Sequence, residues 1–254
     1  MSRPTVNYGS HHNQVADVWR PKELPGDLPV VVLIHGGFWR QMYTKRLMHS
    51  MAGAIVDLGW VAYNIEYRRV GALGSGGWPA TFQDVAAAID ALDTVEGIDL
   101  SRIITCGHSA GGHLALWAAG DRVTGETDQP ARVRPALAVS LAGVVDLIAA
   151  ARMGLGGGAV QALMGGEPDE YPDRYRLGSP ASLLPLGTPQ VLVHGLSDGS
   201  VPPSLSSDFV NLAQQHGDDV TYFPLPNAGH MEMINPSGRA FAHLADCMKG
   251  LDAT

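Results

Sequence analysis

The sequence predicts a three-layer α/β protein, in which a mostly parallel sheet lies between two layers of helices. Short apolar runs alternate along the chain with segments whose apolar residues recur every three or four positions. This alternation is typical of strands joined by crossover helices. Most of the runs are apolar throughout, as expected for strands buried on both faces of a parallel sheet. The length of 254 residues fits one such domain, 1–254.

The strands of the predicted sheet can be assigned in chain order. An extended stretch at Val15–Trp19 comes first and is expected to be an antiparallel edge strand. Six apolar runs are then expected to complete the sheet: Val30–Ile34, Trp60–Ile65, Arg102–Cys106, Ala136–Leu141, Gln190–His194 and Val220–Phe223.

The predicted helices lie between these runs. Their apolar residues form a stripe along each helix, as packing against a sheet requires. Pro79 stands at a favourable first position of one of them. The helical segments are Leu47–Leu58, Pro79–Leu92, His113–Trp117, Leu205–Leu212 and Phe241–Leu251.

One region, residues 147–187, departs from the alternation. It contains two glycine clusters, at 154–158 and 165–166, and then a passage rich in proline and charged residues. Such clusters mark turns, and no strong strand is expected there. We therefore predict a small helical or loop cap inserted between two strands of the sheet.

Composition excludes several classes of protein. The net charge is −8 and the chain has no basic run, so neither nucleic acid nor an anionic membrane surface is an expected partner. The first residues lack the apolar core of a secretory signal, and no stretch is long enough to cross a bilayer, which favours a cytoplasmic protein. The two cysteines, Cys106 and Cys247, are expected to be buried thiols and not part of a disulfide framework.

The strongest motif is the run GHSAGG at 107–112, directly after a predicted strand. It has the form G-x-S-x-G, in the strand–turn–helix context that a nucleophilic serine requires. The glycines allow the backbone to turn sharply beside Ser109. The helix that follows places its positive end near any negative charge that develops there. A glycine-rich turn with a capping serine is the structural alternative.

A second glycine turn, His35–Trp39, follows the first strongly apolar strand. Backbone N–H groups in such a turn can face a reacting oxygen. We expect the N–H of Gly37 or Phe38, together with that of Ala110, to form an oxyanion hole. His35 is expected to hold the loop by hydrogen bonding.

Candidates for an acid and a base follow later in the chain. Asp198 lies in a loop after one predicted strand and His230 in a loop after the next. With Ser109, they fall just past strand ends, at the edge where ligands bind in open α/β sheets. A Ser109–His230–Asp198 triad is therefore predicted. The alternatives are that Asp198 caps the next helix and that His230 is a buried core residue.

These motifs resemble those of α/β-hydrolase esterases, in the group that includes hormone-sensitive-lipase-like carboxylesterases, feruloyl-esterase-like enzymes and kynurenine formamidase (arylformamidase). HGGFW at 35–39 is similar to the HGGxW motif of arylformamidase-like members, and Phe38 departs from the HGGG of lipase-like members. GHSAGGH at 107–113, HGLSDGSVP at 194–202 and AGH at 228–230 are similar to the three triad motifs. The resemblance implies the α/β-hydrolase fold and catalysis through an acyl-enzyme.

Residues beside the motifs are expected to line a substrate pocket: Trp39, His108, Met153, Leu155 and Met231. None of the histidines shows the spacing of a zinc site, so no metal and no cofactor are expected. Arg68 and Asp84 are expected to form a structural ion pair. Asp146 and Glu232 are possible substitutes for the acid, in less suitable loops.

Three functions stay open at this point. The first is a carboxylesterase for small to medium esters, which the short cap and the neutral aromatic loop favour. The second is an arylformamidase that hydrolyses an N-formyl aromatic amine, which HGGFW favours. The third is a non-catalytic binding protein with a hydrolase fold, against which the intact triad counts. A small ester or amide is the expected ligand, and a monomer or homodimer the expected assembly.

Overall fold

An eight-stranded sheet forms the centre of the protein. The computed structural model describes residues 4–22, 26–124 and 130–253. The strands lie across the sheet in the order β1-β2-β4-β3-β5-β6-β7-β8. Their bounds are Thr5–Asn7 (β1), Val15–Trp19 (β2), Leu28–Ile34 (β3), Val61–Ile65 (β4), Ile98–His108 (β5), Leu137–Leu141 (β6), Gln190–Gly195 (β7) and Val220–Leu225 (β8).

One strand, β2, runs against the others. It pairs antiparallel with both β1 and β4, whereas the neighbouring pairs from β4 to β8 are parallel. The predicted antiparallel direction of Val15–Trp19 is confirmed. Its predicted place at the edge is wrong, because Val6 of β1 pairs with Ala16 on the outer side. With three residues, two of them exposed, β1 lacks the apolar run that marks the other strands.

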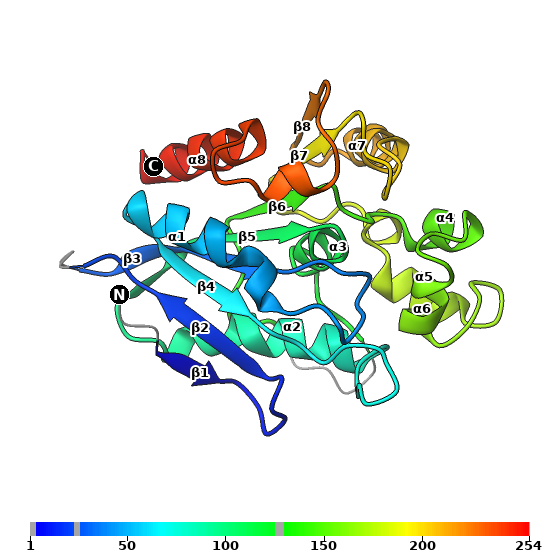
Figure 1. The fold of residues 1–254 in the computed structure, drawn as a ribbon, viewed down its shortest axis with the longest axis horizontal. Coiled ribbons are helices and arrows are strands. Elements are labelled where there is room, and N and C mark those ends of the chain that lie inside the picture. The colour runs from blue at the N-terminus through cyan, green and yellow to red at the C-terminus, as the bar shows by residue number, and fades with distance from the viewer. Residues whose placement is uncertain (1–3, 23–25, 125–129, 254) are drawn as a thin grey trace.

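Helices cover both faces of the sheet. α1 (His49–Asp57) and α8 (Arg239–Asp252) lie on one face. α2 (Ala80–Asp90), α3 (Ala110–Trp117) and α7 (Ser204–Gln215) lie on the other, as the layers in Figure 1 show. The predicted three-layer α/β architecture is confirmed.

The buried side chains of β3 alternate between the two helix layers. Val31 and Leu33 pack with α1 and α8, whereas Val30, Val32 and Ile34 pack on the opposite face. Successive side chains of a strand point to opposite faces of the sheet. Because both faces are covered, the strand is apolar at every one of these positions.

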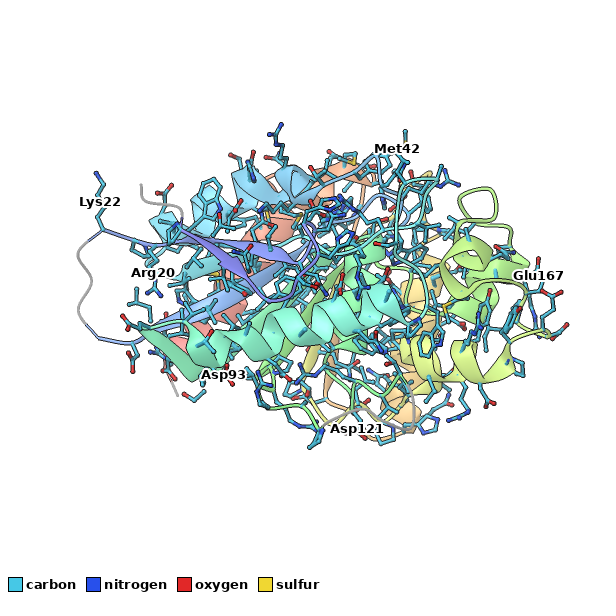
Figure 2. The ribbon with its side chains drawn as sticks, turned by 90° about the horizontal axis from the view of Figure 1, so that it is seen from below. Arg20, Lys22, Met42, Asp93, Asp121 and Glu167 are labelled. Atoms are coloured by element: carbon cyan, nitrogen blue, oxygen red, sulfur yellow. The ribbon has the colours of Figure 1, made fainter. Side chains whose placement is uncertain are left out.

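Residues 147–187 fold as three short helices and one 3₁₀ turn between β6 and β7. They are α4 (Leu147–Arg152), α5 (Ala159–Met164), α6 (Pro172–Gly178) and η3 (Pro180–Ser182). The helices stand together at one end of the molecule, away from α1 and α8 (Figure 1). Figure 2 shows Glu167 projecting from this end, opposite Arg20 and Lys22. The buried side chains of Leu163 and Tyr175 join the segment to the core.

The two cysteines are not joined in a disulfide. Cys106 is buried and Cys247 half-buried, and both are free thiols. Burial raises the pKa of both thiols, so neither is a reactive thiolate. Across the described ranges, no helix combines the length and apolarity needed to span a bilayer.

The strand order creates a crevice at the carboxyl edge of the sheet. β3 lies between β4 and β5. The chain therefore forms β4 on one side of β3 and then crosses over to form β5 on the other side. Loops at such a switch point diverge and leave room for a ligand. The turn His35–Trp39 follows β3, and Ser109 follows β5. Both predicted motifs therefore lie at the switch point.

Candidate active site

Ser109 lies at a sharp turn between β5 and α3. Its backbone angles, φ 57° and ψ −118°, fall in a strained region that residues with a side chain rarely adopt. The Ser109 N–H donates a hydrogen bond of 2.8 Å to the carbonyl oxygen of Leu141. This bond ties the turn to the end of the neighbouring strand β6. Ser109 thus has the strand–turn–helix context that the sequence predicts.

The glycines around this turn lie where no side chain would fit. A Cβ atom on Gly107 would collide with the carbonyl oxygen of Gly111. A Cβ atom on Gly111 would collide with the carbonyl oxygen of Ile34 in β3. The first turn of α3 therefore packs with its backbone directly on two strands.

We expect the substitution Gly107→Ala to destabilise the fold. The new methyl group must displace the first turn of α3, and overpacking of this kind costs about 3 kcal/mol of unfolding free energy. Urea denaturation followed by circular dichroism measures the loss. Gly250→Ala in α8 is the matched control, because its added Cβ would meet no heavy atom within 4 Å apart from its chain neighbours and the backbone of its own helix. An unchanged midpoint for Gly107→Ala would contradict the close backbone contact.

Asp198 and His230 come from the loops after β7 and β8, and their side chains are hydrogen-bonded. The Nδ1 atom of His230 lies 2.7 Å from Oδ2 of Asp198. A carboxylate can only accept, so Nδ1 of His230 carries the hydrogen and Nε2 keeps its lone pair. The Asp198 side chain is fully buried, and that of His230 is 13% exposed.

Ser109 and His230 line one cavity of about 170 Å³. The structure therefore brings Ser109, His230 and Asp198 together from three separate loops. Four further residues named in the sequence analysis line this cavity: Gly37, Phe38, His108 and Met231. Three that the sequence analysis missed complete the lining: Tyr43, Leu47 and Ser200. Ser200 belongs to the HGLSDGSVP motif, which was the available signal for it.

Four hydrogen bonds hold the Asp198 carboxylate. Oδ2 accepts from the rings of His230 and His194. Oδ1 accepts from the N–H groups of Ser200 at 2.8 Å and Val201 at 2.9 Å. Burial alone would raise the pKa of Asp198, but these hydrogen bonds outweigh it and lower the pKa well below its usual range. Asp198 is therefore a fixed negative charge beside His230.

His194 is a second partner of Asp198 that the sequence analysis missed. Its Nε2 atom lies 3.2 Å from Asp198 Oδ2 and 3.1 Å from the carbonyl oxygen of Val201. Both partners are acceptors, so Nε2 carries the hydrogen. Its Nδ1 atom lies 2.7 Å from the hydroxyl of Ser206, which can donate to it. The buried His194 ring thus holds the carboxylate that holds His230.

Three backbone N–H groups beside Ser109 are available to a ligand. Within the ranges that the structure describes, the N–H groups of Gly37, Phe38 and Ala110 donate to no protein acceptor. Gly37 and Phe38 have φ angles of 108° and 51°, so the loop after β3 passes through the left-handed region. Ala110 opens α3, where the first N–H groups have no partner within the helix. Such groups can hold a developing oxyanion.

His108 supports His230 from behind. Its Nε2 atom donates to the backbone carbonyl oxygen of His230 at 3.0 Å, and the two ring centroids are 4.5 Å apart. Burial and the neighbouring His230 ring lower the pKa of His108 to about 3. The His108 ring is therefore neutral, and it fixes the position of the His230 backbone.

Three residues predicted to line the pocket lie elsewhere. Trp39 and Leu155 are buried in the main core, and Met153 borders a separate depression between α4 and α7. The packing of the cap explains why Met153 and Leu155 do not line the cavity. Gly156 meets the Phe38 ring, and a Cβ atom there would collide with it. The cap thus reaches the cavity wall with its backbone, and its neighbouring side chains turn away.

The other candidate polar groups have structural partners. Arg68 and the buried Asp84 are 2.6 Å apart, which confirms the predicted ion pair. Asp146 caps α4, because its Oδ1 accepts from the N–H of Ile148 at 2.9 Å. Glu232 accepts from the N–H of Gly229. Asp146 and Glu232 therefore do not take the place of Asp198.

Ring nitrogens of the histidines at the carboxyl edge are used in protein hydrogen bonds. His35 bonds to Glu66, and His194 and His230 bond to Asp198. Over the described residues, no group of three or more His, Cys, Asp or Glu side chains is arranged to hold a metal ion. The side chains present suit nucleophilic chemistry by Ser109.

The fold and the site define a class of protein. A carbohydrate esterase from gut microbiota, solved in truncated form, superposes with a TM-score of 0.85 at 24% identity, over 100% of this chain and 97% of that one. Thermogutta terrifontis esterase 2, phosphonylated by sarin, superposes with a TM-score of 0.78 at 19% identity, over 96% of this chain and 92% of that one. The protein has the α/β-hydrolase fold, as the resemblance implied.

The chain belongs to the BD-FAE family, which it matches over residues 16–212. Esterase LipC of Mycobacterium tuberculosis is 28% identical over 243 residues, which are 91% of this chain and 60% of that protein. Kynurenine formamidase of Danio rerio is 29% identical over 146 residues, 56% of this chain and 46% of that protein. The chain thus spans about 60% of the length of LipC. The resemblance to this group of hydrolases is confirmed.

Proposed function

We propose that the protein is a serine hydrolase that cleaves carboxylic esters of small to medium size. One observation carries the proposal: Ser109 and the Asp198-bonded His230 line one cavity beside three N–H groups that donate to no acceptor among the described residues. Similarity to proteins named as esterases supports it.

The first half of the reaction forms an acyl-enzyme. His230 takes the proton of the Ser109 hydroxyl at Nε2, and Ser109 Oγ attacks the carbonyl carbon of the ester. Asp198 holds the imidazole in the required tautomer and stabilises the imidazolium that forms. The N–H groups of Gly37, Phe38 and Ala110 stabilise the oxyanion. His230 then donates its proton to the leaving alcohol.

The second half releases the acid. His230 takes a proton from a water molecule, which attacks the acyl carbon, and the oxyanion forms again at the same N–H groups. When the tetrahedral intermediate collapses, His230 returns the proton to Ser109 Oγ. The free carboxylic acid leaves, and the enzyme is restored.

The cavity favours a small, uncharged group next to Ser109. Its volume of about 170 Å³ is below the roughly 300–1,000 Å³ of sites that enclose drug-sized ligands. Phe38, Leu47 and Met231 make much of its wall apolar. We expect acetyl to butyryl esters to be the best substrates.

Arylformamidase is the second candidate function. The HGGFW motif at 35–39 and the similarity to kynurenine formamidases favour it. The same residues can attack a formamide, since His230 can protonate an amine as well as an alcohol.

A substrate panel with active-site labelling tests these proposals. We expect a fluorophosphonate probe to modify Ser109, as mass spectrometry of the peptides can establish. We also expect kcat/KM to be highest for p-nitrophenyl acetate or butyrate and lower for a feruloyl ester and N-formylkynurenine. Higher kcat/KM for N-formylkynurenine would favour the arylformamidase. Absence of both an adduct and hydrolysis would indicate a binding protein.

A further inference from the structure

A second buried histidine–carboxylate pair lies behind the loop that carries Gly37 and Phe38. His35 is the first residue after β3, and Glu66 is the first residue after β4. The last residues of these parallel strands, Ile34 and Ile65, are register partners, which places His35 beside Glu66. The His35 side chain is fully buried, and that of Glu66 is 7% exposed.

Both ring nitrogens of His35 face acceptors. Nε2 lies 2.8 Å from Oε1 of Glu66, and Nδ1 lies 2.7 Å from the carbonyl oxygen of Gly36. Neither a carboxylate nor a carbonyl oxygen can donate. Each nitrogen must therefore carry a hydrogen, which makes the ring an imidazolium.

The surroundings hold this ring in one orientation. Tyr67 stacks on it with a centroid distance of 4.4 Å and an interplanar angle of 12°. The Tyr67 hydroxyl also donates to the carbonyl oxygen of His35 at 2.8 Å. Glu66 is itself held by Arg69 at 2.8 Å and by the N–H of Lys45 at 3.1 Å. The ring cannot turn away from Gly36 without breaking these contacts.

The contact with Gly36 determines the direction of the next N–H group. In a trans peptide, the carbonyl oxygen and the N–H point in opposite directions. The carbonyl oxygen of Gly36 is directed at the His35 ring, so the N–H of Gly37 is directed away from it. Gly37 lines the Ser109 cavity, and its N–H donates to no acceptor among the described residues.

We propose that His35, protonated on both ring nitrogens and paired with Glu66, is a positioning residue that holds the Gly36–Gly37 peptide with its N–H directed at the oxyanion. The proposal rests on the proposed function. His35 does not touch the substrate and exchanges no proton in the reaction. Its contribution is an oxyanion donor that is already oriented before the reaction, which is the property that makes such donors effective.

Two substitutions separate this role from simple filling of the core. The amide nitrogen of Asn occupies the position of Nδ1 of His, and that of Gln occupies the position of Nε2. His35→Asn therefore keeps the donor to Gly36 and loses the one to Glu66, whereas His35→Gln does the reverse. A merely structural role would order the activities of the two variants in the same way as their melting temperatures.

We expect activity and stability to be ordered oppositely. His35→Gln should lower kcat about 100-fold with little change in KM, because the oxyanion forms only in the transition state. His35→Asn should retain kcat within about fivefold, although its melting temperature is the lower of the two. His113→Asn is the matched control, since His113 is also fully buried and its Nε2 atom bonds the carbonyl oxygen of Gly178, a bond that Asn cannot make. It should lower the melting temperature and leave kcat unchanged.

The outcomes distinguish this inference from the proposed function. A wild-type protein without ester hydrolysis or labelling would overturn both. An active wild type with equal kcat for the two His35 variants would overturn only the positioning role. Should the variants fail to fold, ¹⁵N NMR of histidine-labelled wild-type protein at neutral pH remains as a test. Two protonated ring nitrogens on His35 are expected there, and one unprotonated nitrogen would overturn the proposal.

Discussion

Replacing Ser109 by alanine is expected to lower kcat for p-nitrophenyl acetate by about 10⁴-fold or more. Ser109 Oγ is the only protein atom in the proposed mechanism that bonds to the acyl carbon. Without it, the N–H groups and His230 can assist only the attack of water. The remaining rate should therefore be the small part that binding and the oxyanion hole supply.

A test of the fold and a second serine variant serve as controls for Ser109→Ala. The fold should be kept, because alanine adds no atom at the strained turn, and circular dichroism checks it. Ser207→Ala in α7 is the matched control, because the hydroxyl of this serine donates to the Ser204 carbonyl oxygen within its own helix. Near-normal hydrolysis by the Ser109→Ala protein would contradict the proposed role of the triad in catalysis.

Replacing Asp198 by asparagine is expected to lower kcat by about 10⁴-fold. All four hydrogen-bond partners of the Asp198 side chain are donors. In either orientation, the amide nitrogen of asparagine would face N–H groups. The backbone N–H groups of Ser200 and Val201 cannot change, so the amide nitrogen faces the histidine rings, where His230 accepts from it by moving its own hydrogen from Nδ1 to Nε2. In that tautomer Nε2 has no lone pair, so it cannot take the proton of Ser109.

Steady-state kinetics of Asp198→Asn at neutral pH measure the effect. Asp146→Asn is the matched control, because asparagine caps a helix about as well as aspartate, and its kcat should be unchanged. Asp198→Asn with kcat within tenfold of wild type would mean that another group orients His230.

The architecture was accessible from the sequence because its signals are local. Strands buried on both faces must be apolar at each position, and β3, with Val30–Ile34 buried on both sides, shows this directly. The turn at Ser109 was equally accessible, since its glycines lie where a Cβ would collide with backbone. β1 was missed because three residues, two of them exposed, carry no such pattern.

The residues that line the cavity were harder to predict from the sequence. Met153 and Leu155 were expected to line the pocket. The cap instead meets Phe38 through the backbone of Gly156. Tyr43 and Leu47 line the cavity from the segment after β3. Which side a loop residue presents depends on the backbone angles of the loop, and residue type alone does not determine them.

The sequence by itself determined the kind of elements, the turns that carry Ser109, Asp198 and His230, and the resemblance to a family of hydrolases. These follow from periodicity and turn chemistry within short segments. The tertiary structure alone decided which polar groups meet: His194 with Asp198, and His35 with Glu66. The second pairing depends on β3 and β4 lying side by side in register, and such contacts arise only when distant segments pack into one sheet.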